Sequence, residues 1–209
     1  AEAQHRLAAA CRKLFAERES RVHPGRDEKI LTSWNGLMIK GMARAGRVFG
    51  RAEWVHSATR AVDFIRTTLW QNNRLLATCK DDKAHLNAYL DDYAFLLDAL
   101  LELMQAEFHQ PDLDFAVALA EVLLEQFEDK QAGGFFFTSH DHEKLIHRPK
   151  SGHDNATPSG NGVAATALQR LGHLLGEQRY LQAAERSLAL FYPAVSRHAS
   201  SFCSLLMTL

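Results

Sequence analysis

The sequence predicts an all-α domain built from consecutive helical hairpins, and three observations support this. Apolar residues recur at spacings of three and four along most of the 209 residues, which is the period of an amphipathic helix. Two stretches that begin at Ser33 and Ser159 match each other without gaps for about thirty residues, as repeated helical hairpins do. Short connections alternate with long polar ones, so the helices pair two by two.

The N-terminal part is predicted to hold three helices. Residues 3–18 have one apolar face and charges elsewhere, a pattern typical of a surface helix. A polar loop follows, and the next helix covers residues 33–49, since Gly50 is a helix-ending residue. Residues 52–69 continue the apolar period and complete the first hairpin.

The middle part is predicted to hold a short strand and the second hairpin. Residues 74–79 show no helical period and are expected to be a strand. Residues 90–108 are apolar almost all round, which is typical of a helix surrounded by protein. Pro111 marks a break, and the helix expected over residues 113–127 completes the hairpin.

The last part is predicted to contain the third hairpin. A turn and a short strand are expected over residues 133–138, and another short strand that includes Leu145 and Ile146. Helices are expected over residues 158–175 and 179–191, and Pro193 is expected to begin a last helix that ends at Leu209.

Hairpins of this length stack either into a solenoid or into a closed double ring of helices. In a ring, the helices over residues 33–49, 90–108 and 158–175 would be the inner ones. Six such hairpins would need more than roughly 300 residues. We therefore expect residues 1–209 to be one helical-hairpin domain that is a fragment of a larger barrel, and we expect it to self-associate through its open edge.

Composition narrows the functional classes. The net charge is −1 and the charges are interspersed, which disfavours nucleic acid as a partner. No apolar run approaches the about 20 residues that span a bilayer. Cys11, Cys79 and Cys203 are far apart and form no CxxC, so we expect reduced thiols in a cytoplasmic protein, with neither metal nor cofactor.

Polar residues gather in three clusters at the starts of the predicted inner helices, which a ring would bring to one end. The first comprises Asp27, Lys29, Trp34 and Asn35. The second comprises Asp91, Asp92 and Tyr93, and the third His153, Asp154, Asn155, Ser159 and Asn161. Helix N-termini leave backbone N–H groups unpaired and carry partial positive charge. This end therefore favours carboxylates and hydroxyl-rich ligands.

Four of these residues are candidates for catalysis. Adjacent carboxylates such as Asp91 and Asp92 repel each other, which raises at least one pKa towards that of a useful acid. The alternative is that they cap the helix. His153 and Asp154 are candidates for an acid–base pair in a loop, or else play a structural role.

Seven others are candidates for ligand binding. They are Asp27, Lys29, Trp34, Asn35, Tyr93, Ser159 and Asn161. The ring of Trp34 beside the amide of Asn35 offers the stacking and hydrogen bonding that a sugar requires. The alternative places Trp34 in the core, with Asn35 as a cap.

Four ordered motifs carry a family resemblance: Asp27 to Leu37, Leu90 to Phe95, Gly133 to Phe136, and Pro158 to Asn161. They resemble the helical part of the spermatogenesis-associated protein 20 family, which includes bacterial YyaL-like proteins. Members of that family usually also carry a thioredoxin-like domain with a CxxC. The resemblance implies a partial (α/α)6 barrel of the six-hairpin glycosidase type, and a carbohydrate-related cleft.

Two functions remain open at this point. One is a carbohydrate-binding or carbohydrate-modifying domain, glycosidase-like or epimerase-like, that takes a small sugar ligand. Asp91 or Asp92 would be its acid, with Asp154 or Asp27 as second carboxylate for hydrolysis, or His153 as partner for epimerisation. The other is a non-catalytic ligand-binding or scaffolding module that works with the thioredoxin-like domain.

Overall fold

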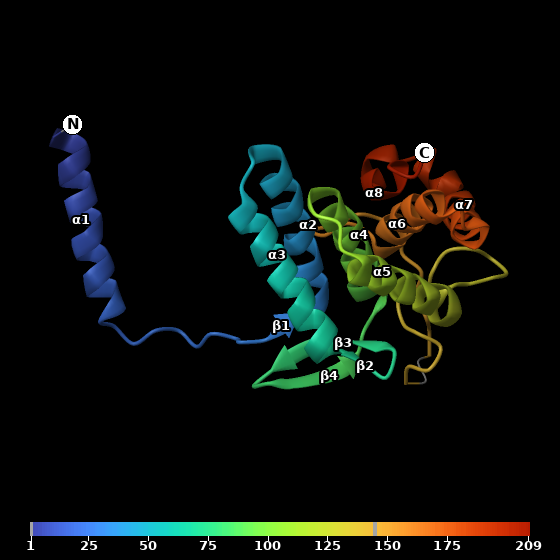
Figure 1. The fold of residues 1–209 in the computed structure, drawn as a ribbon, viewed down its shortest axis with the longest axis horizontal. Helices are drawn as coiled ribbons and strands as arrows, with labels where there is room; N and C mark the ends of the chain where they lie inside the picture. Colours follow the sequence, from blue (N-terminus) through green and yellow to red (C-terminus); the bar gives the residue numbers. More distant parts are fainter. Residues whose placement is uncertain (1, 144–145) are drawn as a thin grey trace.

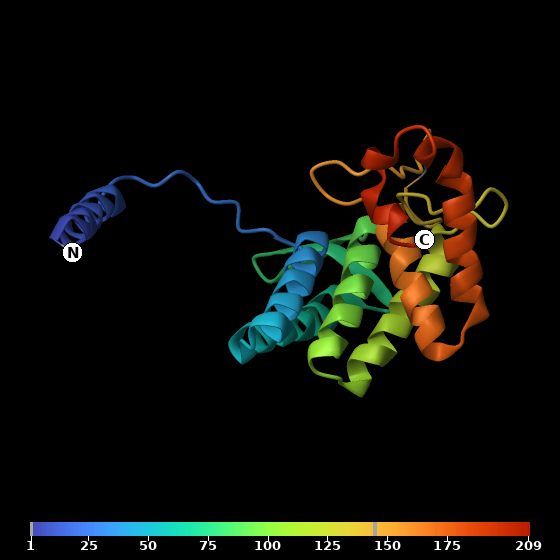
Figure 2. The same cartoon turned by 90° about the horizontal axis from the view of Figure 1, so that it is seen from above.

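The structure, a computed structural model, describes residues 2–143 and 146–209. Three helical hairpins lie side by side (Figure 1, Figure 2): α2 (Thr32–Phe49) with α3 (Ala52–Phe64), α4 (Leu90–Ala106) with α5 (Gln110–Val122), and α6 (Gly160–Leu175) with α7 (Gln178–Val195). In the inner layer, α4 packs between α2 and α6. The predicted hairpins and inner helices are confirmed.

The two stretches of repeated sequence end in the same backbone conformation at their hairpin turns. Gly50 and Gly176 end α2 and α6 in the left-handed conformation, with φ of 65° and 69°. Their N–H groups donate to the carbonyls of Gly46 and Gly172. Glycine adopts this conformation without a side-chain clash, so the same residue ends both inner helices.

The outer helices of the first two hairpins reach their predicted ends, residues 69 and 127, because each α-helix continues into a π-helical turn. α3 passes into a π-helical turn over Ile65–Leu69, and α5 passes into another over Leu123–Phe127. Both turns bury apolar side chains, Leu69 and Phe127 among them. The packing of the hairpins therefore continues to the end of each π turn.

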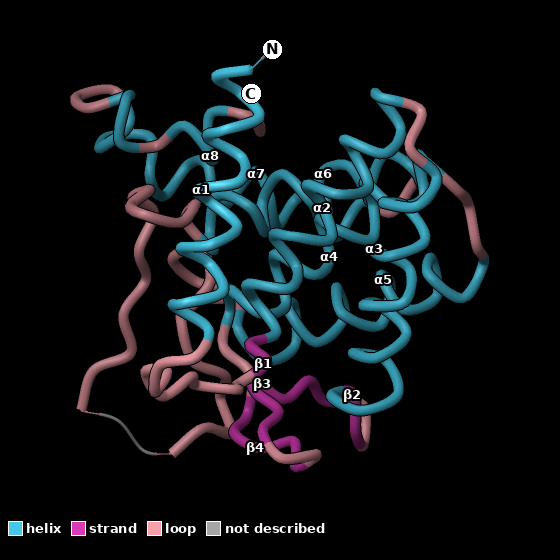
Figure 3. Tube along the Cα trace, turned by 90° about the vertical axis from the view of Figure 1, so that its left-hand side faces the viewer, coloured by secondary structure: helices cyan, strands magenta, loops and turns pink. Residues whose placement is uncertain are grey.

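A small antiparallel sheet lies below the N-terminal end of α2 (Figure 1, Figure 3). Its strands are β1 (Ile30–Leu31), β2 (Trp70–Gln71), β3 (Arg74–Lys80) and β4 (Lys83–Asn87). β3 is central and pairs with the other three. The strand predicted over residues 74–79 is confirmed. β1 and β2 are too short to show an alternation of apolar and polar residues.

Three expectations for the last third differ from the structure. The last helix does not begin at Pro193, because Pro193 lies inside α7 and the chain continues through a 3₁₀ turn (Ala199–Ser201) into α8 (Cys203–Leu206). Proline near a helix C-terminus lacks one N–H donor, and the rest of α7 continues around it. The strand expected over residues 133–138 is reduced to one bridge between Phe135 and Glu128. Of the other expected strand, Ile146 lies in a bend, and Leu145 is outside the described residues.

The first predicted helix is confirmed as α1 (Glu2–Glu19), and it lies apart from the hairpins at the end of an extended segment (Figure 1, Figure 2). None of its residues is buried. α4 is the opposite case, since nearly all of its residues are buried. The core is therefore centred on α4. No helix among the described residues is long and apolar enough to cross a bilayer.

Candidate functional site

The N-terminal ends of α2, α4 and α6 meet, and we call this region the mouth. Oδ1 of Asp92 on α4 accepts a hydrogen bond from the N–H of Ser33 on α2 at 2.8 Å. The carboxylate of Asp91 lies against Gly160, the first residue of α6, so closely that a Cβ at residue 160 would overlap it. The predicted convergence of the inner helix starts is confirmed.

Two hollows open at the mouth. The α6 hollow has a volume of about 170 Å³, and the α2 hollow about 230 Å³. The α6 hollow is lined by residues that include Asp91, Phe137, His153, Ser159 and Asn161. The α2 hollow is lined by residues that include Lys29, Thr78, Tyr89, Asp91, Asp92 and Phe137. Asp91 and Phe137 belong to both hollows and therefore form the boundary between them.

Asp91 is the carboxylate of the mouth that has no protein partner among the described residues. Its side chain is half-buried and makes no hydrogen bond or ion pair within residues 2–143 and 146–209. Burial raises the pKa of Asp91 to about 6. A carboxyl group with this pKa gives and takes protons near neutral pH.

Asp92 is placed as a link between two helices. It is 4% exposed, and its second oxygen accepts from the N–H of Tyr89 at 2.8 Å. Burial raises the pKa of Asp92 to about 6, although the hydrogen bonds from Tyr89 and Ser33 act in the opposite direction. Both oxygens thus satisfy backbone groups that the helix starts leave unpaired.

Asp154 plays a similar linking role in the loop before α6. It accepts from the N–H groups of Ser159 and Ser204, each at 2.8 Å. Burial alone would raise the pKa of Asp154, but the hydrogen bonds from Ser204 and Ser159 outweigh it and hold the pKa below its usual value. The neighbouring His153 is exposed, packs on the Phe202 ring at 4.4 Å, and lines the α6 hollow.

Asn161 and Ser159 shape the wall of the α6 hollow. Oδ1 of Asn161 accepts from the N–H of Phe135 at 2.7 Å, and its Nδ2 donates to the carbonyls of Phe135 and Ser151 at 2.9 Å and 3.0 Å. Ser159 caps α6 by accepting from the N–H of Gly162. The amide of Asn161 is therefore fully used in holding the loop.

Three predicted binding residues lie away from both hollows. Trp34 is 66% exposed and lines neither hollow. Tyr93 is fully buried, and its hydroxyl accepts from the N–H of Leu75 at 2.8 Å. The amide of Asn35 donates to the carbonyl of Leu31 at 2.8 Å.

Asp27 and Lys29 lie at the outer side of the mouth. They form an exposed ion pair at 3.0 Å, and the hydrogen bond from Lys29 lowers the pKa of Asp27. Lys29 also lines the α2 hollow. Of this pair, Lys29 therefore brings its side chain to the hollow that Asp91 borders.

Sequence reasoning missed the aromatic wall of the mouth. The rings of Tyr89 and Phe137 stack at 5.0 Å with an angle of 15°. The hydroxyl of Thr78 is buried in the α2 hollow without a partner in the described part of the chain. The position of Tyr89 directly before the start of α4 is the sequence signal that indicates this aromatic wall.

No protein-family model matches the chain. It is 33% identical to human spermatogenesis-associated protein 20 and 32% identical to the rat protein, over 186 residues in each case. The matches cover 84% of this chain and 24% of each relative. The chain belongs to the spermatogenesis-associated protein 20 family, and the resemblance carried by the four motifs is confirmed. It spans about a quarter of the length of these relatives.

Solved structures show which fold this segment adopts. Cellobiose 2-epimerase of Bacillus thermoamylovorans superposes with a TM-score of 0.66 and 14% identity, over 79% of this chain and 45% of the epimerase. A family 76 α-mannanase of Bacteroides thetaiotaomicron superposes with a TM-score of 0.66 and 13% identity, over 81% of this chain and 46% of the mannanase.

A third structure is an inactive α-1,6-mannanase of Salegentibacter in complex with α-1,6-mannotriose, in which two consecutive aspartates are replaced by asparagine. It gives a TM-score of 0.62 and 14% identity, over 77% of this chain and 46% of that chain. These likenesses confirm the predicted partial (α/α)6 barrel.

Proposed function

We propose that the mouth binds a carbohydrate and that Asp91 exchanges a proton with it. The observation that carries this proposal is the carboxyl group of Asp91, which has no partner among the described residues and has a pKa of about 6, at the boundary of two hollows. The stacked rings of Tyr89 and Phe137 supply an apolar face for a sugar ring. The hydroxyl of Thr78, which has no partner among the described residues, and the ammonium of Lys29 supply polar contacts for sugar hydroxyls.

An epimerase-type reaction fits this geometry best. Epimerisation beside a carbonyl removes a proton from one face of a carbon and returns one to the other face, so it needs two groups that transfer protons. Asp91 and His153 line the same α6 hollow. That one of the superposed structures is a cellobiose 2-epimerase agrees with this choice.

Hydrolysis of a glycosidic bond is the second candidate. It is favoured by the consecutive aspartates Asp91 and Asp92, since the mannanase variant that lacks two consecutive aspartates is inactive. Hydrolysis needs two carboxylates that act on the substrate. Both oxygens of Asp92 and both oxygens of Asp154 are engaged with protein N–H groups, so we rank hydrolysis second.

The test uses the full chain with cellobiose and with α-1,6-mannotriose in D₂O, followed by NMR. Epimerisation places solvent deuterium on a sugar carbon, whereas hydrolysis releases new reducing ends. We expect deuterium incorporation, its loss in Asp91→Asn, and no change in Asp81→Asn, whose side chain lies in an exposed turn. Binding that is unaffected by Asp91→Asn, with no product, would support the non-catalytic module instead.

We also propose that the three hairpins are part of a larger barrel, as coverage of 45% of the epimerase supports. Trp34, Met38 and Val48 are 66%, 62% and 63% exposed on one side of α2, which is the open edge of the inner layer.

We propose that two copies of the chain associate through this edge. We also propose that the chain lies in the cytoplasm, where its free thiols stay reduced. Sedimentation of the chain and of a Met38→Glu variant tests the association, since a monomer at all concentrations contradicts it.

A further inference from the structure

A second polar region lies deeper in the inner layer, on the same side of α4 as Asp91. Asp98 and Glu102 follow Asp91 at steps of seven and four residues, so all three share one face of the helix. Seven residues correspond to about 10 Å along a helix axis. Asp98 and Glu102 are 3% and 5% exposed, so both carboxylates are removed from water.

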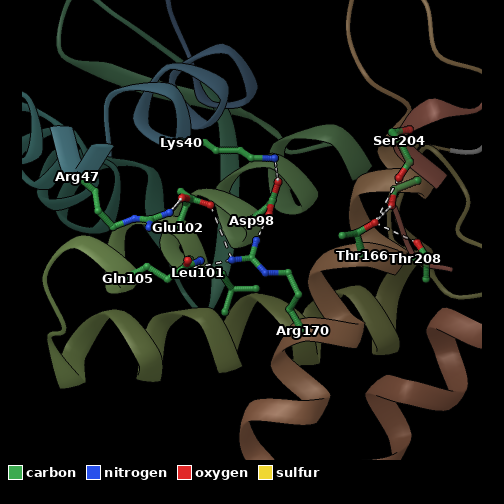
Figure 4. Close-up of polar contacts among 11 residues, drawn as sticks. Lys40, Arg47, Asp98, Leu101, Glu102, Gln105, Thr166, Arg170, Ser204 and Thr208 are labelled. Atoms are coloured by element: carbon green, nitrogen blue, oxygen red, sulfur yellow. Dashed lines mark hydrogen bonds and ion pairs between the residues drawn. The ribbon is translucent and has the colours of Figure 1, made fainter. Parts of the chain in front are cut away.

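Cations from both neighbouring helices hold these two carboxylates (Figure 4). Lys40 on α2 donates to Oδ2 of Asp98 at 2.5 Å, and Arg170 on α6 donates to Oδ1 of Asp98 at 2.7 Å. Arg47 on α2 donates to Oε1 of Glu102 at 2.9 Å. The network therefore joins the three inner helices, and it leaves both carboxylates with their charges compensated.

The cations outnumber the carboxylates. Lys40, Arg44, Arg47 and Arg170 surround the same hollow of about 400 Å³ as Asp98 and Glu102, which leaves two positive charges in excess. Arg44 forms no ion pair and no side-chain hydrogen bond within the described residues. A network that served packing alone would not require Arg44, whose guanidinium keeps all five donors for a ligand.

The hollow also offers neutral groups. Gln105, Gln169 and Thr166 line it, and amide and hydroxyl groups of this kind bind the hydroxyls of a sugar. A guanidinium binds a carboxylate or a phosphate through two parallel hydrogen bonds. We propose that this hollow binds the anionic group of an acidic carbohydrate, a sugar that carries a carboxylate or a phosphate.

This inference rests on the proposed function, because it names the class of sugar that the mouth receives. The hollow reaches Asp98, which lies seven residues after Asp91 on α4, so the mouth and the hollow are separated by about 10 Å along the helix axis. That span suits a disaccharide or a sugar with an extended acidic substituent. A neutral sugar would leave Arg44 without an anionic partner among the described residues.

Calorimetric titration of the full chain at low salt tests the proposal with four probes: glucuronate, glucose 6-phosphate, glucose and inorganic phosphate. We expect one or both acidic sugars to bind at least about tenfold more tightly than glucose. The first two probes also distinguish a carboxylate ligand from a phosphate ligand. Added NaCl should weaken their binding, because salt screens exposed charges.

Two charge-matched variants complete the test. Arg44→Gln should weaken binding of the acidic sugar at least about tenfold and leave glucose unchanged. Arg12→Gln, on the exposed helix α1, should change neither. Equal binding of glucose and both acidic sugars, or acidic-sugar binding that Arg44→Gln does not change, overturns the proposal.

The outcomes separate this proposal from the proposed function. If Asp91→Asn abolishes sugar conversion while Arg44→Gln leaves acidic-sugar binding unchanged, the proposed function stands and this proposal falls. If binding of phosphate and the acidic sugars depends on Arg44 but no sugar is converted, the anion hollow stands and the proposed reaction falls. Absence of binding by all four probes overturns the anion hollow.

Discussion

The placement of Asp91 predicts that its removal stabilises the protein above neutral pH. Burial raises the pKa of Asp91 from 3.8 to about 6, so the folded state holds a proton more tightly than the unfolded state. The stability from this group is fully present below about pH 4 and is lost as the pH rises through 6. Asp91→Asn keeps the shape of the side chain and removes the charge.

The magnitude follows from the shift. Two pKa units correspond to about 3 kcal/mol, at about 1.4 kcal/mol for each unit. Asp91 is only half-buried, and contact with solvent reduces this figure. We therefore expect Asp91→Asn to raise the free energy of unfolding by about 1–2 kcal/mol at pH 8 and by almost nothing at pH 4.

Urea denaturation followed by circular dichroism, at intervals from pH 4 to pH 8, measures this difference. Asp81→Asn is the matched control, and its curve should follow that of the original chain at every pH. A loss of stability in Asp91→Asn at pH 8, or a difference between variant and original chain that does not change with pH, would refute the reasoning. The first result would mean that Asp91 has a partner that stabilises its charged form, and the second that folding does not shift its pKa.

Three further predictions concern the scaffold of the mouth. Asp92→Ala removes the acceptor for the N–H groups of Ser33 and Tyr89. Hydrogen exchange at both amides should therefore accelerate at least tenfold. Unchanged protection would show that Asp92 does not hold the two helix starts together. Asn161→Ala removes three hydrogen bonds and should lower the free energy of unfolding by about 2–4 kcal/mol in urea, whereas a loss below about 0.5 kcal/mol would contradict the clamp. Deletion of residues 1–20 should leave that free energy within about 0.5 kcal/mol, because none of residues 2–20 is buried. A larger loss would mean that α1 packs on the hairpins.

The hairpins could be predicted because their information is local. Apolar periods of three and four residues, with Gly50 and Gly176 at the turns, specify both helices and their ends. The two-residue strands β1 and β2 carry no such period, since their pairing partner β3 is distant in sequence. The same limit applies to the loop before α6, whose shape depends on Asn161 and Asp154.

The candidate site could be predicted as a region and less well residue by residue. Successive residues of a helix point about 100° apart, so Asp91, Asp92 and Tyr93 point in three different directions. Asp91 lines the hollows, Asp92 reaches α2, and Tyr93 enters the core. The ionic network had a visible signal, because Asp98 and Glu102 interrupt an otherwise apolar helix.

The central claim is that the inner helix starts hold a free, proton-exchanging Asp91 in a sugar-binding mouth. The carboxyl ¹³C shift of Asp91, followed by NMR from pH 3 to pH 8 with and without a bound sugar, tests it most directly. We predict a pKa of about 6, and a further rise when sugar excludes water from the hollow. Titration near pH 4 that no sugar alters would contradict the claim.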